Sequence, residues 1–216
     1  MDIVKTLEAF KIVPVIVIED ADKAVPLAKA LVDGGLPVVE VTFRTKAAPE
    51  AIARIAKEVP DAVVGAGTVL TKEQLKRAID SGAKFAVAPG FDPEIFAEAK
   101  KSGFPFVPGV ATASELSCAI RDGAPMVKFF PAEVAGGVKA IKALLGAFRF
   151  TGVRFMPTGG VSLNNLADYL AVPEIAAVGG TWIAPAKLID TSDWGAIRKA
   201  ASEAVSISRR LTSAGR

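Results

Sequence analysis

Short runs of apolar and β-branched residues recur along this 216-residue chain at nearly even intervals. The runs start 20 to 28 residues apart, which leaves room for one helix between neighbouring runs but not for a second domain. Runs that are continuously apolar, rather than alternating, are typical of strands buried on both faces of a parallel sheet. The eight predicted strands are residues 12–18, 38–43, 62–69, 85–89, 105–110, 126–131, 154–158 and 175–183.

The intervals between the runs show helical patterns. Ile52, Ile55 and Ala56 lie on one face of a helix, and Thr71 followed by Gln74 has the spacing of a capping box, which predicts a helix start after the third strand. Residues 2–10 are predicted to form an amphipathic helix before the first strand. Regular alternation of strand and helix indicates a parallel sheet covered by helices.

Eight such units predict an α/β fold of the (β/α)8 TIM-barrel type, with an extra N-terminal helix and a single domain over residues 1–216. This length is close to the lower limit of about 200 residues for the barrel, so its loops must be short. A doubly wound open sheet is the alternative, although it normally has fewer strands. We expect residues 211–216 to be a frayed tail.

Lys128 interrupts the sixth apolar run, Met126–Pro131. The alternation of a strand places Lys128 on the same face as Met126 and Phe130. Lysine is seldom fully buried unless paired. Desolvation disfavours the ammonium form of lysine, and a neutral amine attacks carbonyls to form Schiff bases. Pairing with a carboxylate, or extension of the side chain from a strand end to solvent, is the alternative interpretation.

The chain contains no histidine, which removes the commonest metal ligand and the commonest general base. This argues against zinc hydrolases and histidine-ligated metal aldolases, so we expect no metal, and acid–base chemistry falls to Glu, Asp, Lys or Tyr. The single Cys118 cannot form an intramolecular disulfide and favours a reducing compartment.

Charge and hydropathy narrow the class of partner. The 26 basic and 23 acidic residues give a net charge of +3 without a basic run, which argues against nucleic-acid binding. The chain also lacks an N-terminal signal-peptide pattern and any apolar stretch of about 18 residues, the length of a membrane span. We therefore expect a soluble cytoplasmic protein with no membrane partner.

Polar residues at the carboxyl ends of barrel strands are candidates for an active site. The second strand places Glu40 and Arg44 on one face, and the third run ends near Thr68. Without histidine, Glu40 is the candidate acid–base group beside Lys128, with a purely structural counter-ion as the alternative. The guanidinium of Arg44 suits a substrate carboxylate. Thr68 offers a hydroxyl, or caps the following helix.

Glycine pairs lie at the ends of the last two predicted strands, at Gly159–Gly160 and Gly179–Gly180. Loops at these two strand ends often bind phosphate in barrels of this type, because glycine lets backbone N–H groups approach an anion. Tight turns are the alternative role. The pattern predicts a substrate with a carboxylate near Arg44 and a phosphate near Gly160 and Gly180.

Four segments resemble the signature motifs of the bacterial 2-keto-3-deoxy-6-phosphogluconate (KDPG) aldolases. They are Gly35–Arg44, Gly65–Leu70, Gly123–Glu133 with Gly136–Ala140, and Pro157–Gly160. The resemblance runs nearly end to end. It implies a carbon–carbon lyase, specifically a class I Schiff-base aldolase of Entner–Doudoroff carbohydrate metabolism. Such an enzyme needs no cofactor and often also cleaves 4-hydroxy-2-oxoglutarate (KHG). The resemblance also implies a homotrimer.

The resemblance also implies roles for individual residues. The Schiff-base lysine of the family matches Lys128, and its proton-transferring glutamate matches Glu40. The positions that bind pyruvate or line its pocket match Arg44, Thr68, Pro89, Phe130 and Thr158. The phosphate-binding positions match Gly159, Gly160, Gly179, Gly180 and Thr181. Thr181 stands where the family commonly has serine, which keeps the hydroxyl and adds a methyl group.

The implied reaction starts with attack of Lys128 on the C2 ketone of a phosphorylated 2-keto acid. Glu40 then takes the C4 hydroxyl proton while the C3–C4 bond breaks, and glyceraldehyde 3-phosphate and pyruvate leave. Three alternatives remain from the sequence. They are an aldolase for the C4 epimer 2-keto-3-deoxy-6-phosphogalactonate, a phosphosugar isomerase or epimerase on the same barrel, and a non-catalytic trimeric scaffold.

Overall fold

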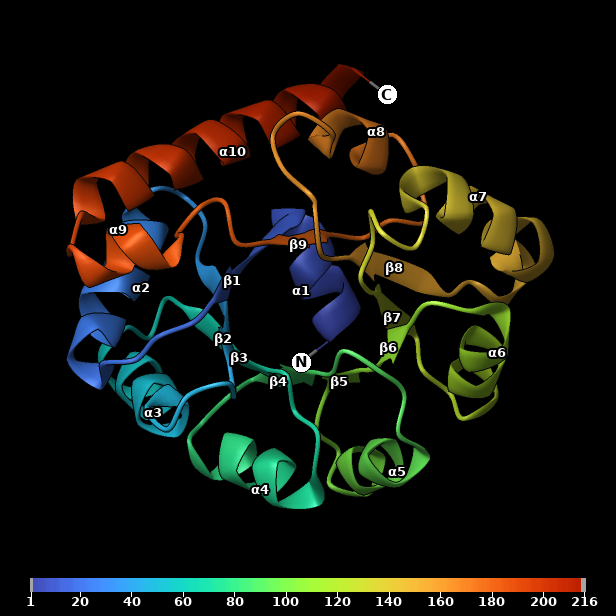
Figure 1. Cartoon of the computed structure of the whole chain (residues 1–216), viewed down its shortest axis with the longest axis horizontal. Helices are drawn as coiled ribbons and strands as arrows, with labels where there is room; N and C mark the ends of the chain where they lie inside the picture. The colour runs from blue at the N-terminus through green and yellow to red at the C-terminus, as the bar shows by residue number, and fades with distance from the viewer. Residues whose placement is uncertain (1, 215–216) are drawn as a thin grey trace.

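The computed structural model describes residues 2–214, and it consists of parallel strands surrounded by helices (Figure 1). The strands are β1 (Ile12–Ile16), β2 (Val38–Thr42), β3 (Val63–Gly67), β4 (Phe85–Val87), β5 (Phe106–Val107), β6 (Gly109–Val110), β7 (Met126–Phe129), β8 (Arg154–Pro157) and β9 (Val178–Gly180). One sheet has the order β5-β4-β3-β2-β1-β9 and the other β6-β7-β8. In Figure 1 both sheets curve around a common centre, with most helices outside them.

The helices follow the strands in regular alternation. The α-helices are α1 (Ile3–Phe10), α2 (Ala24–Asp33), α3 (Ala48–Glu58), α4 (Lys72–Asp80), α5 (Pro93–Lys101), α6 (Ala113–Arg121), α7 (Gly137–Phe148), α8 (Leu166–Leu170), α9 (Ala186–Asp190) and α10 (Trp194–Ala214). The short 3-10 helices η1 (Ala21–Lys23) and η2 (Arg149–Thr151) lie between them. Helix α1 precedes β1, and in the view of Figure 1 it overlaps the centre of the strands; its buried residues are Ile3 and Leu7.

The C-terminal segment differs from expectation. Helix α10 continues through Ala214, so the prediction of a frayed tail over residues 211–216 is wrong as far as Ala214, and residues 215–216 lie outside the described residues. Arginine, leucine and alanine are strong helix formers, and Arg209, Arg210 and Leu211 extend the helix without a breaking residue.

Each apolar run predicted as a strand contains a strand, but the fifth run contains two. The break falls at Pro108, which has no N–H group to donate to a neighbouring strand and interrupts the ladder between β5 and β6. The backbone nevertheless continues the pairing toward β7, because the N–H of Lys128 on that strand donates to the Pro108 carbonyl at 2.8 Å. β5 and β6 are therefore consecutive parts of one extended segment.

Side-chain caps fix where the outer helices begin. The Thr71 hydroxyl accepts from the N–H of Gln74 at 3.1 Å, which confirms the predicted start of α4. The Gln74 side chain reaches back to the N–H of Leu70 at 2.7 Å, one residue before the cap. Thr112 and Glu115 form a complete capping box at the start of α6. Both helices thus begin directly after a strand or its loop.

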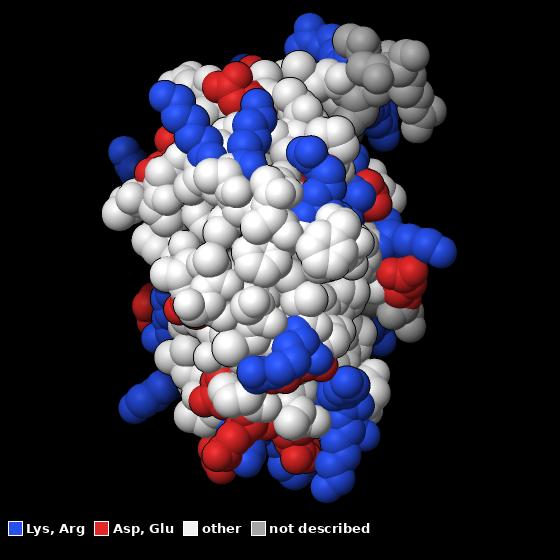
Figure 2. Space-filling view, turned by 90° about the vertical axis from the view of Figure 1, so that its right-hand side faces the viewer, with Lys and Arg blue, Asp and Glu red and all other residues white. Residues whose placement is uncertain are grey.

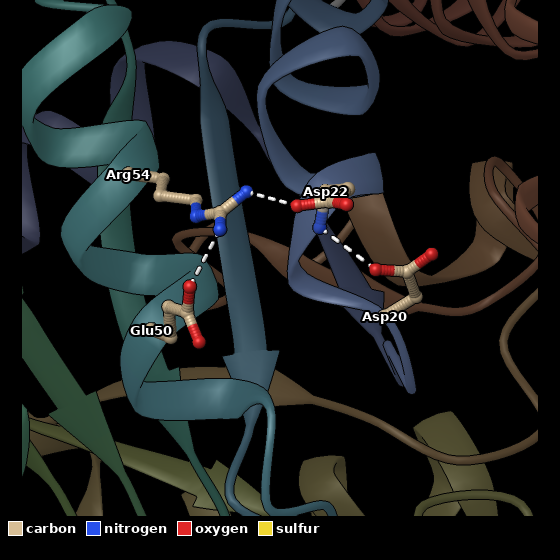
Figure 3. Close-up of polar contacts among 4 residues, drawn as sticks. All are labelled: Asp20, Asp22, Glu50 and Arg54. Atoms are coloured by element: carbon tan, nitrogen blue, oxygen red, sulfur yellow. Dashed lines mark hydrogen bonds and ion pairs between the residues drawn. The ribbon is translucent and has the colours of Figure 1, made fainter.

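Exposed ion pairs lie on the outer surface and connect neighbouring units. Arg54 on α3 donates to Asp22 and to Glu50, and the Asp22 N–H donates to the carboxylate of Asp20 at 2.9 Å (Figure 3). This cluster links η1 to α3. Because these side chains are exposed, their ion pairs contribute little to stability and position the surface loop rather than the core.

The interior is apolar except at a few positions. The buried polar or charged residues in the described chain are Glu40, Thr42, Lys128, Thr158 and Ser208. Four of these lie on or directly after β2, β7 and β8, so the polar interior is concentrated on the central strands. Within residues 2–214, no helix combines the length and the apolar character that a membrane crossing requires.

Candidate active site

Lys128 and Glu40 face each other inside the ring of strands. The Lys128 side chain is 4% exposed and the Glu40 side chain 0%, and Lys128 Nζ lies 3.2 Å from Glu40 Oε1. The two residues are 88 positions apart and lie on β7 and β2, which are not paired in either sheet. The contact therefore crosses the interior, as the inward alternation of both strands predicts. The predicted meeting of an amine and a carboxylate is present.

The second oxygen of Glu40 has no partner. Glu40 Oε2 is buried and accepts no hydrogen bond from any residue between 2 and 214. Unpaired buried polar atoms are rare and costly, and they call for a functional explanation. One oxygen of this carboxylate thus holds the amine, while the other is available to a molecule that enters the interior.

Gly67, the last residue of β3, makes room for this carboxylate. A Cβ atom at this position would lie 2.2 Å from Glu40 Oε1, closer than any real contact. Thr42 and Gly67 are in register between β2 and β3, so the glycine lies beside the end of β2. Glycine inside a strand often marks such a close approach. This role of Gly67 was not identified from the sequence, although that signal was present.

Apolar groups enclose the amine. Lys128 Nζ lies 5.5 Å from the centroid of the Phe130 ring, and Met156 on β8 is in register with Lys128. Phe130 is half-buried and Met156 is fully buried. The enclosure excludes water from the amine, while the aromatic face stabilises a positive charge at Nζ. Phe130, which the sequence predicts to line the pocket, lies beside the Lys128 amine.

Thr158 provides a second unpartnered polar atom. Its side chain is buried, and Oγ1 makes no hydrogen bond in the described chain. A Cβ at Gly179 would lie 2.3 Å from this oxygen, so the bare backbone of Gly179 accommodates the hydroxyl. Because Thr158 lies two residues beyond Met156, the register partner of Lys128, its side chain points to the same face of the sheet.

Thr68 has an unusual backbone conformation. Its φ angle is +57°, in the left-handed region that a β-branched residue seldom adopts. Such strain is found where surrounding structure holds a residue for a functional reason. Thr68 directly follows Gly67, so the strained residue adjoins the glycine that touches Glu40. Pro89, another predicted pocket residue, follows β4 and is half-buried.

Arg44 does not continue the inward face of β2. The strand ends at Thr42, and Arg44 lies in the following turn with its side chain exposed, so the predicted alternation through Arg44 is wrong. The N–H of Phe43 donates to the Gly67 carbonyl at 2.7 Å as the last bond between β2 and β3, and the chain turns after it. Arg44 lines a surface hollow together with Lys46 and Arg77, so this hollow is basic. The structure does not bring Arg44 into contact with Lys128.

The glycine pairs lie at the ends of β8 and β9. Gly159 and Gly160 have φ angles of +100° and +82°, which suit glycine in a tight turn. In the described chain, the N–H groups of Gly160, Val161 and Thr181 have no hydrogen-bond acceptor. A turn with free N–H groups forms a concave site for an anion. The predicted phosphate loops therefore present donors.

Gly180 has a packing role that the sequence did not reveal. A Cβ there would lie 1.5 Å from the ring of Trp182, so the indole covers this backbone. Thr181, between them, is exposed. Among residues 2–214, no group of three or more Asp, Glu or Cys side chains is arranged to hold a metal ion.

Comparison with known proteins identifies the family. Residues 3–200 match the family described as KDPG and KHG aldolase. This chain belongs to that family. It is 46% identical to the 2-dehydro-3-deoxy-phosphogluconate aldolase of Treponema pallidum over 205 residues, covering 95% of this chain and 97% of that protein. It is 48% identical to the KHG/KDPG aldolase of Escherichia coli over 194 residues, covering 90% of each.

Solved structures of this aldolase family agree with the fold. The KDPG aldolase of Legionella pneumophila, which holds pyruvate as a covalent carbinolamine, matches with a TM-score of 0.89 and 40% identity over 93% of this chain and 97% of that one. The enzyme of Zymomonas mobilis with 3-phosphoglycerate matches with a TM-score of 0.84 and 44% identity over 92% of this chain and 94% of that one. The relatives are therefore aldolases, and the neighbours share the curled parallel α/β architecture.

Proposed function

We propose that this chain is a class I aldolase that cleaves KDPG to pyruvate and glyceraldehyde 3-phosphate, and KHG to pyruvate and glyoxylate. The observation that carries the proposal is the buried contact of 3.2 Å between Lys128 Nζ and Glu40 Oε1. The Legionella relative, which holds pyruvate as a carbinolamine, supports covalent chemistry of this kind. We infer a place in sugar-acid catabolism of the Entner–Doudoroff type.

The first steps use the proton shared by the pair. Transfer of one proton from the Lys128 ammonium to Glu40 leaves a neutral amine, whose electron pair attacks the C2 carbonyl carbon of the keto acid. Glu40 returns that proton to the hydroxyl of the resulting carbinolamine, which leaves as water, so that a protonated imine forms and Glu40 is a carboxylate again. This imine accepts the electrons of the later bond cleavage, so the reaction needs no metal or other cofactor.

Cleavage and release use Glu40 again. Glu40 removes the C4 hydroxyl proton, the C3–C4 bond breaks, its electrons move to the imine, and the aldehyde leaves. The remaining enamine takes a proton from Glu40 at C3, and water hydrolyses the imine to release pyruvate and the free amine. The unpartnered Glu40 Oε2 supports this double role, because an oxygen free of protein donors can exchange a proton with substrate.

The pyruvate moiety is proposed to lie among Thr68, Pro89, Phe130 and Thr158, with its carboxylate toward Arg44. The unsatisfied Thr158 Oγ1 supports a ligand hydrogen bond at this position. Arg44 is exposed and makes no ion pair in the described chain, so its guanidinium is available to a carboxylate at the mouth of the site.

The phosphate is proposed to bind between Gly159–Gly160 and Gly179–Thr181. The free N–H groups of Gly160 and Thr181 support this assignment, and the Zymomonas relative with 3-phosphoglycerate supports a phosphorylated ligand. Thr181 would add its hydroxyl as a donor. The two ends of the substrate would then be held by different strand ends.

We further propose that the two sheets close into one (β/α)8 barrel in a single domain that includes the N-terminal helix. Parallel bridges between Phe155 and Ile175 and between Thr158 and Gly179 support closure between β8 and β9. On the other side, β5 and β6 are parts of one extended segment. Closure would bring all eight carboxyl strand ends to one face.

We propose that the active form is a cytoplasmic homotrimer. Figure 2 shows the face that carries α6 and α7, where charged side chains lie mainly toward the upper and lower margins and uncharged groups fill the middle. Phe150, in η2 directly after α7, is 89% exposed. A broad uncharged surface of this kind favours association with further copies of the chain. Light scattering of the purified protein measures the assembly.

A coupled assay tests the proposed function. The purified chain should release pyruvate from KDPG and KHG, and borohydride with pyruvate should inactivate it through one adduct on Lys128. An isomerase or epimerase on the same barrel would give no adduct, and a scaffold would give neither adduct nor pyruvate. A parallel assay with 2-keto-3-deoxy-6-phosphogalactonate compares the two C4 epimers, because the fold also matches a native KDPGal structure with a TM-score of 0.84 and 26% identity.

A further inference from the structure

Glu133 lies directly against the proposed phosphate loop although it is outside the proposed catalytic and binding residues. Its N–H donates to the carbonyl of Gly159 at 3.0 Å, and the N–H of the preceding Ala132 donates to the carbonyl of Thr158 at 2.8 Å. Both bonds run from the segment after β7 to the segment after β8. The loop that follows Lys128 therefore supports the loop that would hold phosphate.

The side chain of Glu133 fills the space that a side chain at Gly160 would need. A Cβ at Gly160 would lie 2.6 Å from Glu133 Cγ and 2.7 Å from its Cβ. Gly160 also adopts a φ angle of +82°, and its carbonyl accepts from the Asn165 side chain at 3.1 Å. Gly160 is thus held between Glu133 on one side and the start of α8 on the other, and the position of Glu133 influences the turn.

Tyr169 fixes the carboxylate of Glu133. The Tyr169 side chain on α8 is fully buried, and its hydroxyl donates to Glu133 Oε1. Burial, together with the bond to Glu133, raises the pKa of Tyr169 above its ordinary value, so the phenol stays protonated and remains a donor at neutral pH. A Cβ at Gly137 would lie 3.0 Å from Glu133 Oε1 and 3.4 Å from the Tyr169 hydroxyl, so little free space surrounds the contact.

We propose that Glu133, held by Tyr169, is a positioning residue that sets the geometry of the Gly159–Gly160 loop and thereby the preference for phosphorylated over unphosphorylated substrates. This inference rests on the proposed aldolase function. The pair touches only the phosphate side of the site, and neither residue contacts Lys128 or Glu40 in the described contacts. Its loss should therefore affect binding of the phosphate and leave imine chemistry unchanged.

Three variants separate the hydrogen bond from the charge. Tyr169→Phe removes the donor but keeps the ring, and Glu133→Ala removes the acceptor. Glu133→Gln keeps an oxygen that can accept from Tyr169, so it is the conservative variant. Asp168→Asn is the matched control, because Asp168 is an exposed carboxylate next to Tyr169 that makes no hydrogen bond to the loop.

The expected readout is a difference between two substrates. Tyr169→Phe and Glu133→Ala should each lower kcat/KM for KDPG about 10-fold, mainly through KM, which corresponds to the loss of one hydrogen bond to a charged group. The kcat/KM for KHG and the rate of borohydride trapping with pyruvate should stay within about twofold of wild type. Glu133→Gln and Asp168→Asn should resemble wild type with both substrates.

A double-mutant cycle decides the mechanism. If the two residues act as one unit, Glu133→Ala with Tyr169→Phe should lose no more KDPG activity than either single variant. Equal losses with KDPG and KHG, or fully additive losses, or no loss from Glu133→Ala, would overturn the proposal. If Tyr169→Phe does not fold, the exposed Glu133 variants give the same comparison. Failure of the aldolase function itself would appear as absence of cleavage and trapping in the wild type.

Discussion

Replacement of Glu40 by glutamine tests the proposed chemistry most directly. The amide matches the carboxylate in size, so it fits the space left by Gly67, where a Cβ would lie 2.2 Å from Glu40 Oε1. Its oxygen can still accept a hydrogen bond from Lys128, whose Nζ lies 3.2 Å from Glu40 Oε1 in the wild-type chain. Imine formation should persist, because water that enters with the substrate can take the proton from Lys128 and return it to the leaving hydroxyl in place of Glu40. The amide cannot carry a proton between the C4 hydroxyl and C3.

Glu40→Gln should lower both the rate of cleavage and the stability of the fold, and the two losses can be compared. A general acid–base group accounts for about 100- to 10,000-fold in rate, which corresponds to about 3 to 5 kcal/mol in the activation barrier. Removal of one partner from a buried ion pair costs about 3 to 5 kcal/mol of stability, because it leaves an uncompensated charge. Glutamine still offers its dipole to the lysine, so the loss of stability should be smaller than that, while the rate should fall by the full range of about 100- to 10,000-fold for a lost acid–base group.

Three measurements on the same sample separate the roles of Glu40. The thermal midpoint reports stability, borohydride trapping with pyruvate reports imine formation, and pyruvate release from KDPG reports turnover. We expect trapping near the wild-type level and turnover reduced at least 100-fold. A variant with a lower thermal midpoint but near-normal turnover per folded molecule would show that Glu40 is only a structural counter-ion, and the proposed mechanism would be wrong.

Four further predictions address neighbouring parts of the site and the fold. Lys128→Ala should abolish cleavage and the borohydride adduct while the fold is retained, and peptide mass spectrometry that places the adduct elsewhere in wild type would refute the assignment. Gly67→Ala should displace Glu40 from Lys128 and cost about 1 to 3 kcal/mol by overpacking, read as lower turnover and a lower thermal midpoint. Thr181→Asp, at an exposed position, should repel phosphate and lower kcat/KM for KDPG but not for KHG, whereas equal losses would place Thr181 outside the phosphate site. The N–H groups of Ala111 and Thr112 lower the pKa of Glu115 in the folded state. The ionised Glu115 therefore stabilises the fold above the unfolded pKa of about 4.3, and this stabilisation is lost as pH falls through the lower folded pKa. Glu115→Gln should reduce the thermal midpoint at pH 7 and differ less from wild type at low pH.

The acidic probe at the phosphate end is placed at Thr181 for a steric reason. Gly180 belongs to the same proposed site, but a Cβ there would lie 1.5 Å from the Trp182 ring. Gly180→Asp would therefore displace the indole as well as repel an anion, and a loss of activity could not be attributed to charge. The exposed Thr181 side chain lets the charge be tested without that rearrangement.

The strand pattern predicted much of the interior from the sequence. Alternation along β2 and β7 predicted that Glu40 and Lys128 point inward, and both side chains are buried and in contact. This succeeded because a strand in a buried sheet has only two faces, so a charged residue in an apolar run either faces the interior or breaks the strand. The glycine pairs likewise lie at the strand ends where the barrel rule expects them.

Features set by contacts between distant segments could not be predicted in the same way. β2 ends at Thr42, and the hydroxyl of Thr45 in the following turn donates to the carbonyl of Ile18 at 2.6 Å. The contact between Glu133 and Tyr169 joins residues 36 positions apart on a loop and a helix. No local periodicity encodes either arrangement, because each depends on how neighbouring units pack.

The distribution of charge in the interior constrains how the proposed reaction can proceed. In the described chain, Glu40 and Lys128 are the only buried charged residues. Any proton that moves between enzyme and substrate away from solvent must therefore pass through this pair. Glu40 would serve both the cleavage step and the later protonation at C3, with the proton taken from the C4 hydroxyl delivered to C3. The pyruvate end would then carry all of the bond chemistry, while the phosphate end contributes binding energy that positions the C3–C4 bond beside Glu40.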